Sequence, residues 1–223
     1  MRMYHHKYLE LLSETCREFN IHLIADEIAV GFGRTGTMFG FQQAKITPDI
    51  ICLSKGITGG YMTLSTILTT DDIYDAFYDE YEKLNAFLHS HSYTANPIAC
   101  SAANATLDIF KDKDVIKKNK ILSAHMKKCF ESLKDHAHVS DVRQKGMVLA
   151  IELIKDKKRK LAYDWKERRG IRAYLHGLKN NVLMRPLGNV LYFMPPYIIT
   201  KKEISFVSEI MKEGVDEATK KNS

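Results

Sequence analysis

The chain has 223 residues, of which 45% are hydrophobic, and its formal net charge is +6 with neutral histidines. This length fits one large domain or two small ones, and the hydrophobic content is ordinary for a globular core. No stretch approaches the roughly 18–20 apolar residues that span a membrane, and the first residues lack the apolar region of a secretory signal. We therefore expect a cytoplasmic protein.

The cysteines and the basic residues exclude several other classes of protein. The four cysteines are widely spaced without a C-x-x-C pair, which favours reduced thiols over a disulfide framework or a zinc site. His89 and His91 do not complete a metal-binding set, so we expect no metal. The excess lysines, as in KDKKRK, alternate with acids and lack interleaved aromatic residues, which indicates a solvated surface rather than a nucleic-acid site.

The first 110 residues alternate between helical and strand patterns. Asn96 is a good N-cap and Pro97 fits the first position of the helix that follows. The alternation predicts an α/β layer with a mostly parallel sheet, whose strand ends face the ligand crevice. In chain order we predict a helix over 3–19, strands over 21–25, 49–54 and 62–68, a helix over 71–84, and the helix that begins at 97.

The composition shifts near residues 111–116, where a charged stretch follows Phe110. We place a domain boundary there, which gives domains 1–113 and 114–223, the second a smaller α+β domain. In that second domain we predict helices over 116–133, 164–179 and 201–218, and strands over 147–154, 182–185 and 190–194.

Two apolar runs end in residues that carry chemistry. Asp26 stands at the tip of the first run and Lys55 at the end of the second, 29 residues later (55 − 26). A buried lysine can lose its proton and form a Schiff base with a carbonyl, and a buried acid nearby can keep a ring nitrogen protonated. We interpret the pair as buried groups that hold pyridoxal phosphate (PLP).

Three blocks carry a resemblance to a known family: ADEIAVGFGRTG, PDIICLSKGITGG and HSYTANPIACSAANATL. In order and spacing they resemble the class III, fold type I, PLP-dependent aminotransferases, and such joint matching is more specific than any single glycine pattern. The resemblance extends from Met1 to about Ala218. It implies that 1–113 is the C-terminal half of the PLP-binding large domain and that 114–223 is the small C-terminal domain.

The resemblance also implies a role for each matching residue. Lys55 would hold the cofactor and move the proton during transamination, and Asp26 would pair with the ring nitrogen. Ser92 would bind the cofactor phosphate, which in the family belongs to the neighbouring subunit's site. Arg185 would bind the carboxylate of the keto substrate with its bidentate fork, and Tyr192 would line the same pocket.

Alternatives to some of these assignments remain open. Glu27 stands beside Asp26 and could be confused with it, while Ser90 and Thr94 compete with Ser92. Arg34 follows a glycine-rich loop, but we favour a structural role because no obvious helix N-terminus follows it.

Within the family, blocks such as MRMYHHKYL and LMRPLGNVLYFMPPYIIT are most similar to members that act in biotin synthesis. This implies conversion of 7-keto-8-aminopelargonate to 7,8-diaminopelargonate by a homodimer, with S-adenosylmethionine as the expected amino donor, although some relatives use lysine. One rival is a class III ω-aminotransferase with another substrate.

The chain also begins inside a block that the family carries mid-chain. The resemblance therefore implies that the phosphate cradle and the aromatic ring that stacks on the cofactor come from a preceding half. A second rival follows, namely a fragment that is inactive without this half and only binds a partner.

Overall fold

The structure is a computed structural model that describes residues 1–220. It divides into two compact units. The N-terminal unit is Tyr4–Ile116, and the C-terminal unit is Lys117–Ser223 together with Met1–Met3. Among residues 1–220, none of the helices combines the length and the apolar character that crossing a bilayer requires.

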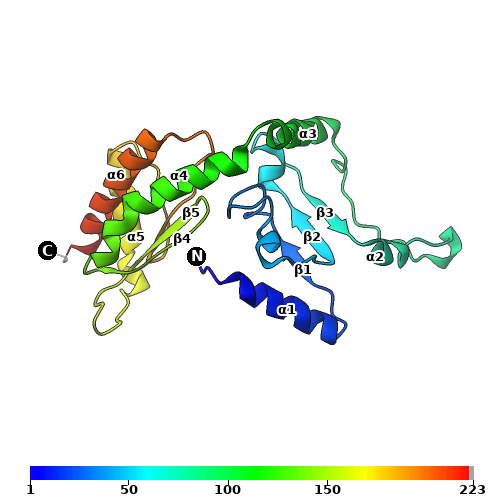
Figure 1. The fold of residues 1–223 in the computed structure, drawn as a ribbon, viewed down its shortest axis with the longest axis horizontal. Helices are drawn as coiled ribbons and strands as arrows, with labels where there is room; N and C mark the ends of the chain where they lie inside the picture. The colour runs from blue at the N-terminus through cyan, green and yellow to red at the C-terminus, as the bar shows by residue number, and fades with distance from the viewer. Residues whose placement is uncertain (221–223) are drawn as a thin grey trace. The chain divides into compact units, whose positions relative to one another are not determined.

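A three-stranded sheet forms the centre of the N-terminal unit, in the order β1-β2-β3 (Figure 1). β1 (Ile24–Asp26) pairs with β2 (Ile50–Leu53) in parallel, whereas β3 (Thr66–Thr69) pairs with β2 in antiparallel orientation. The expected α/β architecture is present, but only one of the two strand pairs is parallel. The connection between β2 and β3 contains the short 3-10 helix η2 (Lys55–Thr58) and returns the chain antiparallel within the same sheet.

The first strand is less covered than its apolar sequence suggested. We predicted a strand over 21–25 that is buried on both faces, but Ile21 and Ile24 are more than half exposed. The strand is also shorter than we predicted, since β1 covers only Ile24–Asp26, and it lies at the edge of the sheet. The small core of this unit is formed instead by Phe32, Leu53, Ile57 and Ala103.

The helices of the N-terminal unit follow local signals where a packing partner exists. α1 (His6–Glu18) lies inside the predicted range, and α3 (Pro97–Asp112) begins as expected, since the Asn96 side chain accepts hydrogen bonds from the backbone N–H groups of Ile98 and Ala99. The predicted helix over 71–84 is wrong in length. Only α2 (Asp71–Asp75) and the 3-10 turn η3 (Tyr81–Lys83) form, because the aromatic side chains of this segment are exposed and no buried apolar face supports a longer helix.

A four-stranded antiparallel sheet, in the order β4-β5-β7-β6, organises the C-terminal unit. We did not predict its first strand, β4 (Val139–Lys145), which pairs with β5 (Val148–Leu153) through a tight turn at Gly146. β7 (Val190–Phe193) lies inside its predicted range, whereas β6 (Arg185–Leu187) starts three residues later than we predicted. β4 and β6 are the edge strands, and the central strand β5 is almost fully buried.

Helices complete the core of the C-terminal unit. α4 (Val115–Phe130) continues into the 3-10 turn η4 (Glu131–Asp135), and the predicted helix over 164–179 resolves into the turn η5 (Trp165–Glu167) and α5 (Arg169–Lys179). α6 (Lys201–Thr219) packs on α5 and begins with a capping box between Thr200 and Glu203. Fully buried apolar side chains between these helices and the sheet include Met126, Phe130, Leu149, Ile151, Leu191, Ile204 and Met211.

Candidate active site

Asp26 and Lys55 follow two neighbouring strands at the same edge of the sheet. Asp26 ends β1 and pairs in register with Cys52 of β2, and Lys55 comes two residues after the end of β2. Because β1 and β2 are parallel, their carboxyl ends lie side by side, which is where ligands bind in α/β sheets. The structure thus brings together the two residues that we assigned to PLP.

Our expectation that both groups are buried is wrong for the described residues. Asp26 and Lys55 are exposed. The sheet holds three strands with β1 at its edge, so the apolar runs before these residues do not carry them into an interior. The amine and the carboxylate at these two strand ends can meet a ligand from solvent.

Lys55 has an unusual backbone conformation. Its φ angle is +44°, in the left-handed region that a lysine rarely adopts. Hydrogen bonds within the connection between β2 and β3 hold the surrounding turn, since the Ser54 hydroxyl donates to the Leu64 carbonyl at 2.7 Å and the Thr58 hydroxyl donates to the Met62 carbonyl at 2.6 Å. Such strain costs on the order of 1–3 kcal/mol and persists only where the surroundings impose it, most often at functional sites.

The structure separates the roles of the two neighbouring acids. An Asp26 oxygen accepts a hydrogen bond from the Ile28 N–H at 3.0 Å while the side chain stays exposed. Glu27 is only 3% exposed, and its two oxygens accept hydrogen bonds from the backbone N–H groups of Gly40 and Phe41, each at 2.9 Å. Glu27 is therefore committed to the protein itself, and Asp26 is the acid that a ligand could reach.

Ser92 lies in the exposed, irregular segment before α3. Of its competitors, Thr94 accepts a hydrogen bond from the His91 N–H at 3.0 Å through its hydroxyl, so it stabilises the local turn. Ser92 itself is exposed. This arrangement leaves Ser92 the better placed of these two hydroxyls to bind an external phosphate.

Arg185 and Tyr192 belong to the C-terminal unit. Arg185 is the first residue of β6, and it pairs in register with Tyr192 of β7. Arg185 is exposed and Tyr192 is half-buried, so the guanidinium group can reach an anion from solvent.

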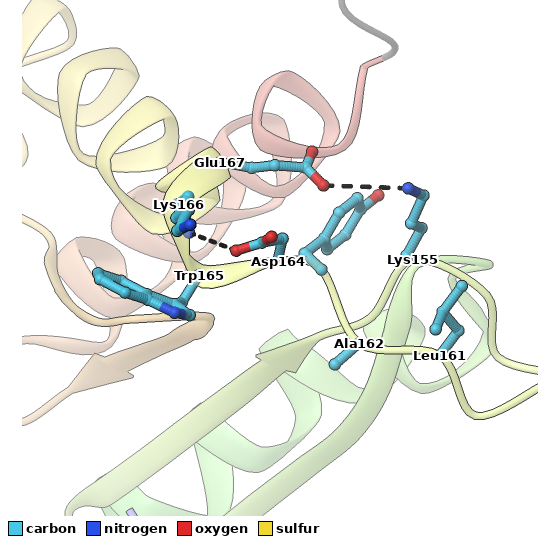
Figure 2. A pocket seen from close by; sticks show the side chains of 8 residues that line it. Lys155, Leu161, Ala162, Asp164, Trp165, Lys166 and Glu167 are labelled. Atoms are coloured by element: carbon cyan, nitrogen blue, oxygen red, sulfur yellow. Dashed lines mark hydrogen bonds and ion pairs between the residues drawn. The ribbon is translucent and has the colours of Figure 1, made fainter.

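A surface hollow in the C-terminal unit contains none of the predicted site residues (Figure 2). Asp164 caps the turn η5 by accepting from the Lys166 N–H at 2.9 Å, and Glu167 lies 4.0 Å from the Lys155 ammonium. Glu167 is also bonded to the buried Arg169, whose guanidinium holds the pKa of the Glu167 carboxyl below its usual range. The charged groups of this hollow thus serve the local fold. The residues that line it are Lys155, Leu161, Ala162, Tyr163, Asp164, Trp165, Lys166 and Glu167.

A strand-end lysine beside a strand-end aspartate, on this fold, is the arrangement that we expect of a PLP-dependent transaminase. The chain matches the family described as Aminotransferase class-III over residues 1–215. It therefore belongs to the class III aminotransferases, and its fold is the fold type I of PLP-dependent transaminases.

Two curated relatives of this chain carry the same enzyme name. The chain is 46% identical to the adenosylmethionine-8-amino-7-oxononanoate aminotransferase of Helicobacter pylori, an alignment that covers 99% of this chain and 50% of the relative. It is 44% identical to the enzyme of the same name from Geobacter sulfurreducens, over 95% of this chain and 47% of the relative. The chain thus spans about half the length of these relatives.

Solved structures of aminotransferases superpose closely on this chain. The adenosylmethionine-8-amino-7-oxononanoate aminotransferase of Methanocaldococcus jannaschii superposes with a TM-score of 0.90 at 41% identity, covering 94% of this chain and 49% of that one. An omega transaminase from Pseudomonas jessenii, solved in complex with PMP, superposes with a TM-score of 0.89 at 28% identity, covering 95% of this chain and 47% of that one.

Proposed function

We propose that this chain provides the catalytic lysine of a PLP-dependent aminotransferase that converts 7-keto-8-aminopelargonate to 7,8-diaminopelargonate in the cytoplasm. The observation that carries the proposal is the placement of Asp26 and Lys55 at the ends of two adjacent parallel strands, with Lys55 held at a positive φ. The names of the relatives support the substrate, and S-adenosylmethionine is the proposed amino donor.

The residues present fit PLP by their chemistry. When bound, PLP supplies a carbonyl for the amino group and a pyridinium ring that accepts an electron pair. Lys55 offers an exposed amine that would hold the carbonyl and carry a proton to and from the substrate carbon. The Asp26 carboxylate would keep the ring nitrogen protonated, and the Ser92 hydroxyl would bind the phosphate.

Substrate binding would fall to the β6–β7 pair. A guanidinium fork matches a carboxylate in a bidentate manner, so Arg185 would bind the carboxylate of the keto acceptor. Tyr192, its partner across the strands, would line the same pocket and orient the aliphatic part of the substrate.

We also propose that the assembled enzyme is a homodimer. The segment between α2 and α3 runs out from the sheet (Figure 1) and leaves large apolar side chains in solvent, which is typical of an interaction surface. Ser92 lies on this segment, and in the proposed dimer it would serve the cofactor of the second subunit. The exposed side chains are Tyr74 at the end of α2 and, in the segment itself, Phe77, Tyr78, Tyr81, Leu84, Phe87, Leu88 and Tyr93.

The decisive experiment is a visible absorption spectrum with added PLP. It is recorded for the chain alone and for the chain co-expressed with the N-terminal half of the Helicobacter pylori relative, with Lys55→Ala as the control. We expect an absorption band that Lys55→Ala abolishes in at least one of the two preparations. A spectrum without such a band in either preparation would contradict the proposal and favour a chain that only binds a partner.

The chief rival differs only in its substrate. Omega transaminases share the fold closely at 28% identity, so an ω-amino acid or diamine is the alternative. Assays with S-adenosylmethionine, lysine and 4-aminobutyrate as donors separate the two. Activity with 4-aminobutyrate alone would favour the rival.

A further inference from the structure

Glu27 is a buried carboxylate that the proposed chemistry does not use. It is one of few charged side chains that the described residues bury almost completely, and it accepts two backbone N–H groups at the start of the 3-10 helix η1 (Gly40–Ala44). A carboxylate buried without partners would be costly, whereas one that accepts two N–H groups at a helix start is stabilised. Glu27 thus closes the loop 28–39 onto the end of β1.

Two glycines lie close to Glu27, one beside its carboxylate and one beside its backbone carbonyl. A Cβ atom at Gly40 would lie 3.2 Å from a Glu27 carboxylate oxygen, and a Cβ at Gly31 would lie 2.8 Å from the Glu27 carbonyl. The Gly31 N–H also donates to this carbonyl at 2.8 Å. Gly31 in the loop and Gly40 at the start of η1 therefore leave room for the contacts of Glu27.

The same residue is connected to both members of the Asp26–Lys55 pair. Its own N–H donates to the Cys52 carbonyl at 3.0 Å, which extends the β1–β2 pairing just beyond Asp26. The loop that it closes carries Phe32, which is 3% exposed and packs against Gly56, where a Cβ atom would lie only 3.0 Å from the ring. Gly56 directly follows Lys55, so the loop reaches the lysine turn as well.

We propose that Glu27 is a positioning residue for the cofactor site: its carboxylate fixes the loop 28–39 so that Asp26 and Lys55 keep one mutual geometry. This inference rests on the proposed function, because it assigns Glu27 a role through the residues that would hold PLP. Glu27 does not touch the cofactor in this proposal, and it acts through the Asp26 turn and through Phe32 against Gly56.

The test compares two glutamates that make the same kind of contact. Glu27→Gln keeps the shape of the side chain but replaces one acceptor oxygen with an amide that faces an N–H group. Glu203→Gln is the matched control, since Glu203 accepts from the Thr200 N–H at 2.7 Å and from the Thr200 hydroxyl at 2.8 Å in the C-terminal unit. Gly40→Ala is a milder second variant that pushes the Glu27 carboxylate without removing it.

Two measurements are made on each variant. Amide hydrogen exchange of the full chain reports whether Gly40 and Phe41 are protected, and a PLP titration reports the dissociation constant in whichever preparation shows the Lys55-dependent band. We expect exchange at these two amides to rise about tenfold or more in Glu27→Gln, as for loss of a hydrogen bond to a charged acceptor. We expect the PLP dissociation constant to rise about fivefold or more, with a displaced pH midpoint of the band, because small misplacements at a site are costly.

The controls and the possible outcomes distinguish the role of Glu27 from the proposed function. Glu203→Gln should leave both readings unchanged, and Gly40→Ala should move both in the direction of Glu27→Gln by a smaller amount, which keeps the test valid if Glu27→Gln does not fold. Unchanged exchange at Gly40 and Phe41, or raised exchange with an unchanged PLP dissociation constant and pH midpoint, would overturn the assignment of Glu27 alone. A wild-type chain without any Lys55-dependent band would instead overturn the proposed function, and the role of Glu27 with it.

Discussion

Arg185 and Tyr192 lie directly opposite each other on the antiparallel strands β6 and β7. Residues in such a pair extend from the same face of the sheet, so the guanidinium and the phenol ring share one surface. The position of β6 is in turn fixed by α5, because Gly170 of that helix lies against Pro186 and the Gly188 carbonyl. A substrate bound by Arg185 would therefore be held by a strand that cannot shift without disturbing a helix.

Replacing Arg185 by lysine should weaken acceptor binding. Lysine keeps the charge but loses the bidentate fork, so we expect KM for 7-keto-8-aminopelargonate to rise about tenfold with a smaller change in kcat. Steady-state kinetics of the assembled enzyme measure this. Arg159→Lys, at a side chain that is 84% exposed, is the control. Equal KM values in both variants would remove Arg185 from the binding site.

Asp26→Asn should impair the chemistry while leaving the local turn intact. The amide oxygen of asparagine can still accept from the Ile28 N–H, but the negative charge that would hold a ring proton is lost. We expect kcat of the assembled enzyme to fall by about 10²-fold or more. Asp72→Asn, at an exposed acid in α2, is the control. A variant that keeps wild-type kcat would exclude Asp26 as the partner of the ring nitrogen.

Gly170→Ala tests the contact between α5 and β6. The added methyl group would lie 2.4 Å from the Gly188 carbonyl and 2.6 Å from the Pro186 Cβ, which the fold cannot accept without moving the strand. We expect the free energy of unfolding to fall by about 1–3 kcal/mol. Leu175→Ala, at a half-exposed position of the same helix, should cost less. Urea denaturation compares them, and equal losses would contradict the tight contact.

The Glu167–Arg169 pair predicts a dependence of stability on pH. Arg169 holds the pKa of the Glu167 carboxyl below its unfolded value, so the pair stabilises the fold fully above the unfolded pKa of about 4.3 and loses this contribution as pH falls through the folded pKa. We expect Glu167→Gln to lower the free energy of unfolding by about 1–3 kcal/mol at pH 7, because the buried Arg169 loses a charged partner.

Below pH 4 the difference between Glu167→Gln and the wild type should shrink, since the wild-type carboxyl is then protonated too. Urea titrations at pH 7, 5 and 3.5 measure it. Glu209→Gln removes a side chain that is 65% exposed and should have little effect at any of these pH values. A difference that stays constant with pH would show that Glu167 acts by packing alone.

The sequence predicted those features that depend on local chemistry or on three joint motifs. The cap of α3 by Asn96 is such a local feature, and the motifs around Asp26 and Lys55 identified the family. The burial of Asp26 and Lys55 was predicted wrongly. An apolar run before a residue does not show whether other helices or strands cover that residue. β4 was missed since VSDVRQK is largely polar and gains its stability from pairing with β5.

The role of Glu27 could not be read from its position either. From the sequence, Glu27 was only a second carboxylate that could be mistaken for Asp26 as the partner of the ring nitrogen. Its hydrogen bonds reach residues 13 and 14 positions further along, and a contact at that separation depends on the path of the loop.

The positive φ of Lys55 has a consequence for how this position tolerates change. Glycine or asparagine would adopt the same backbone angle more easily, so a substitution that destroys the chemistry would relieve strain and make the chain more resistant to unfolding. A selection for solubility or yield alone would therefore favour variants in which another residue replaces Lys55. If lysine is retained at position 55 in a library of random variants that is selected for function, the amine is required, and this conclusion needs no assay of the reaction.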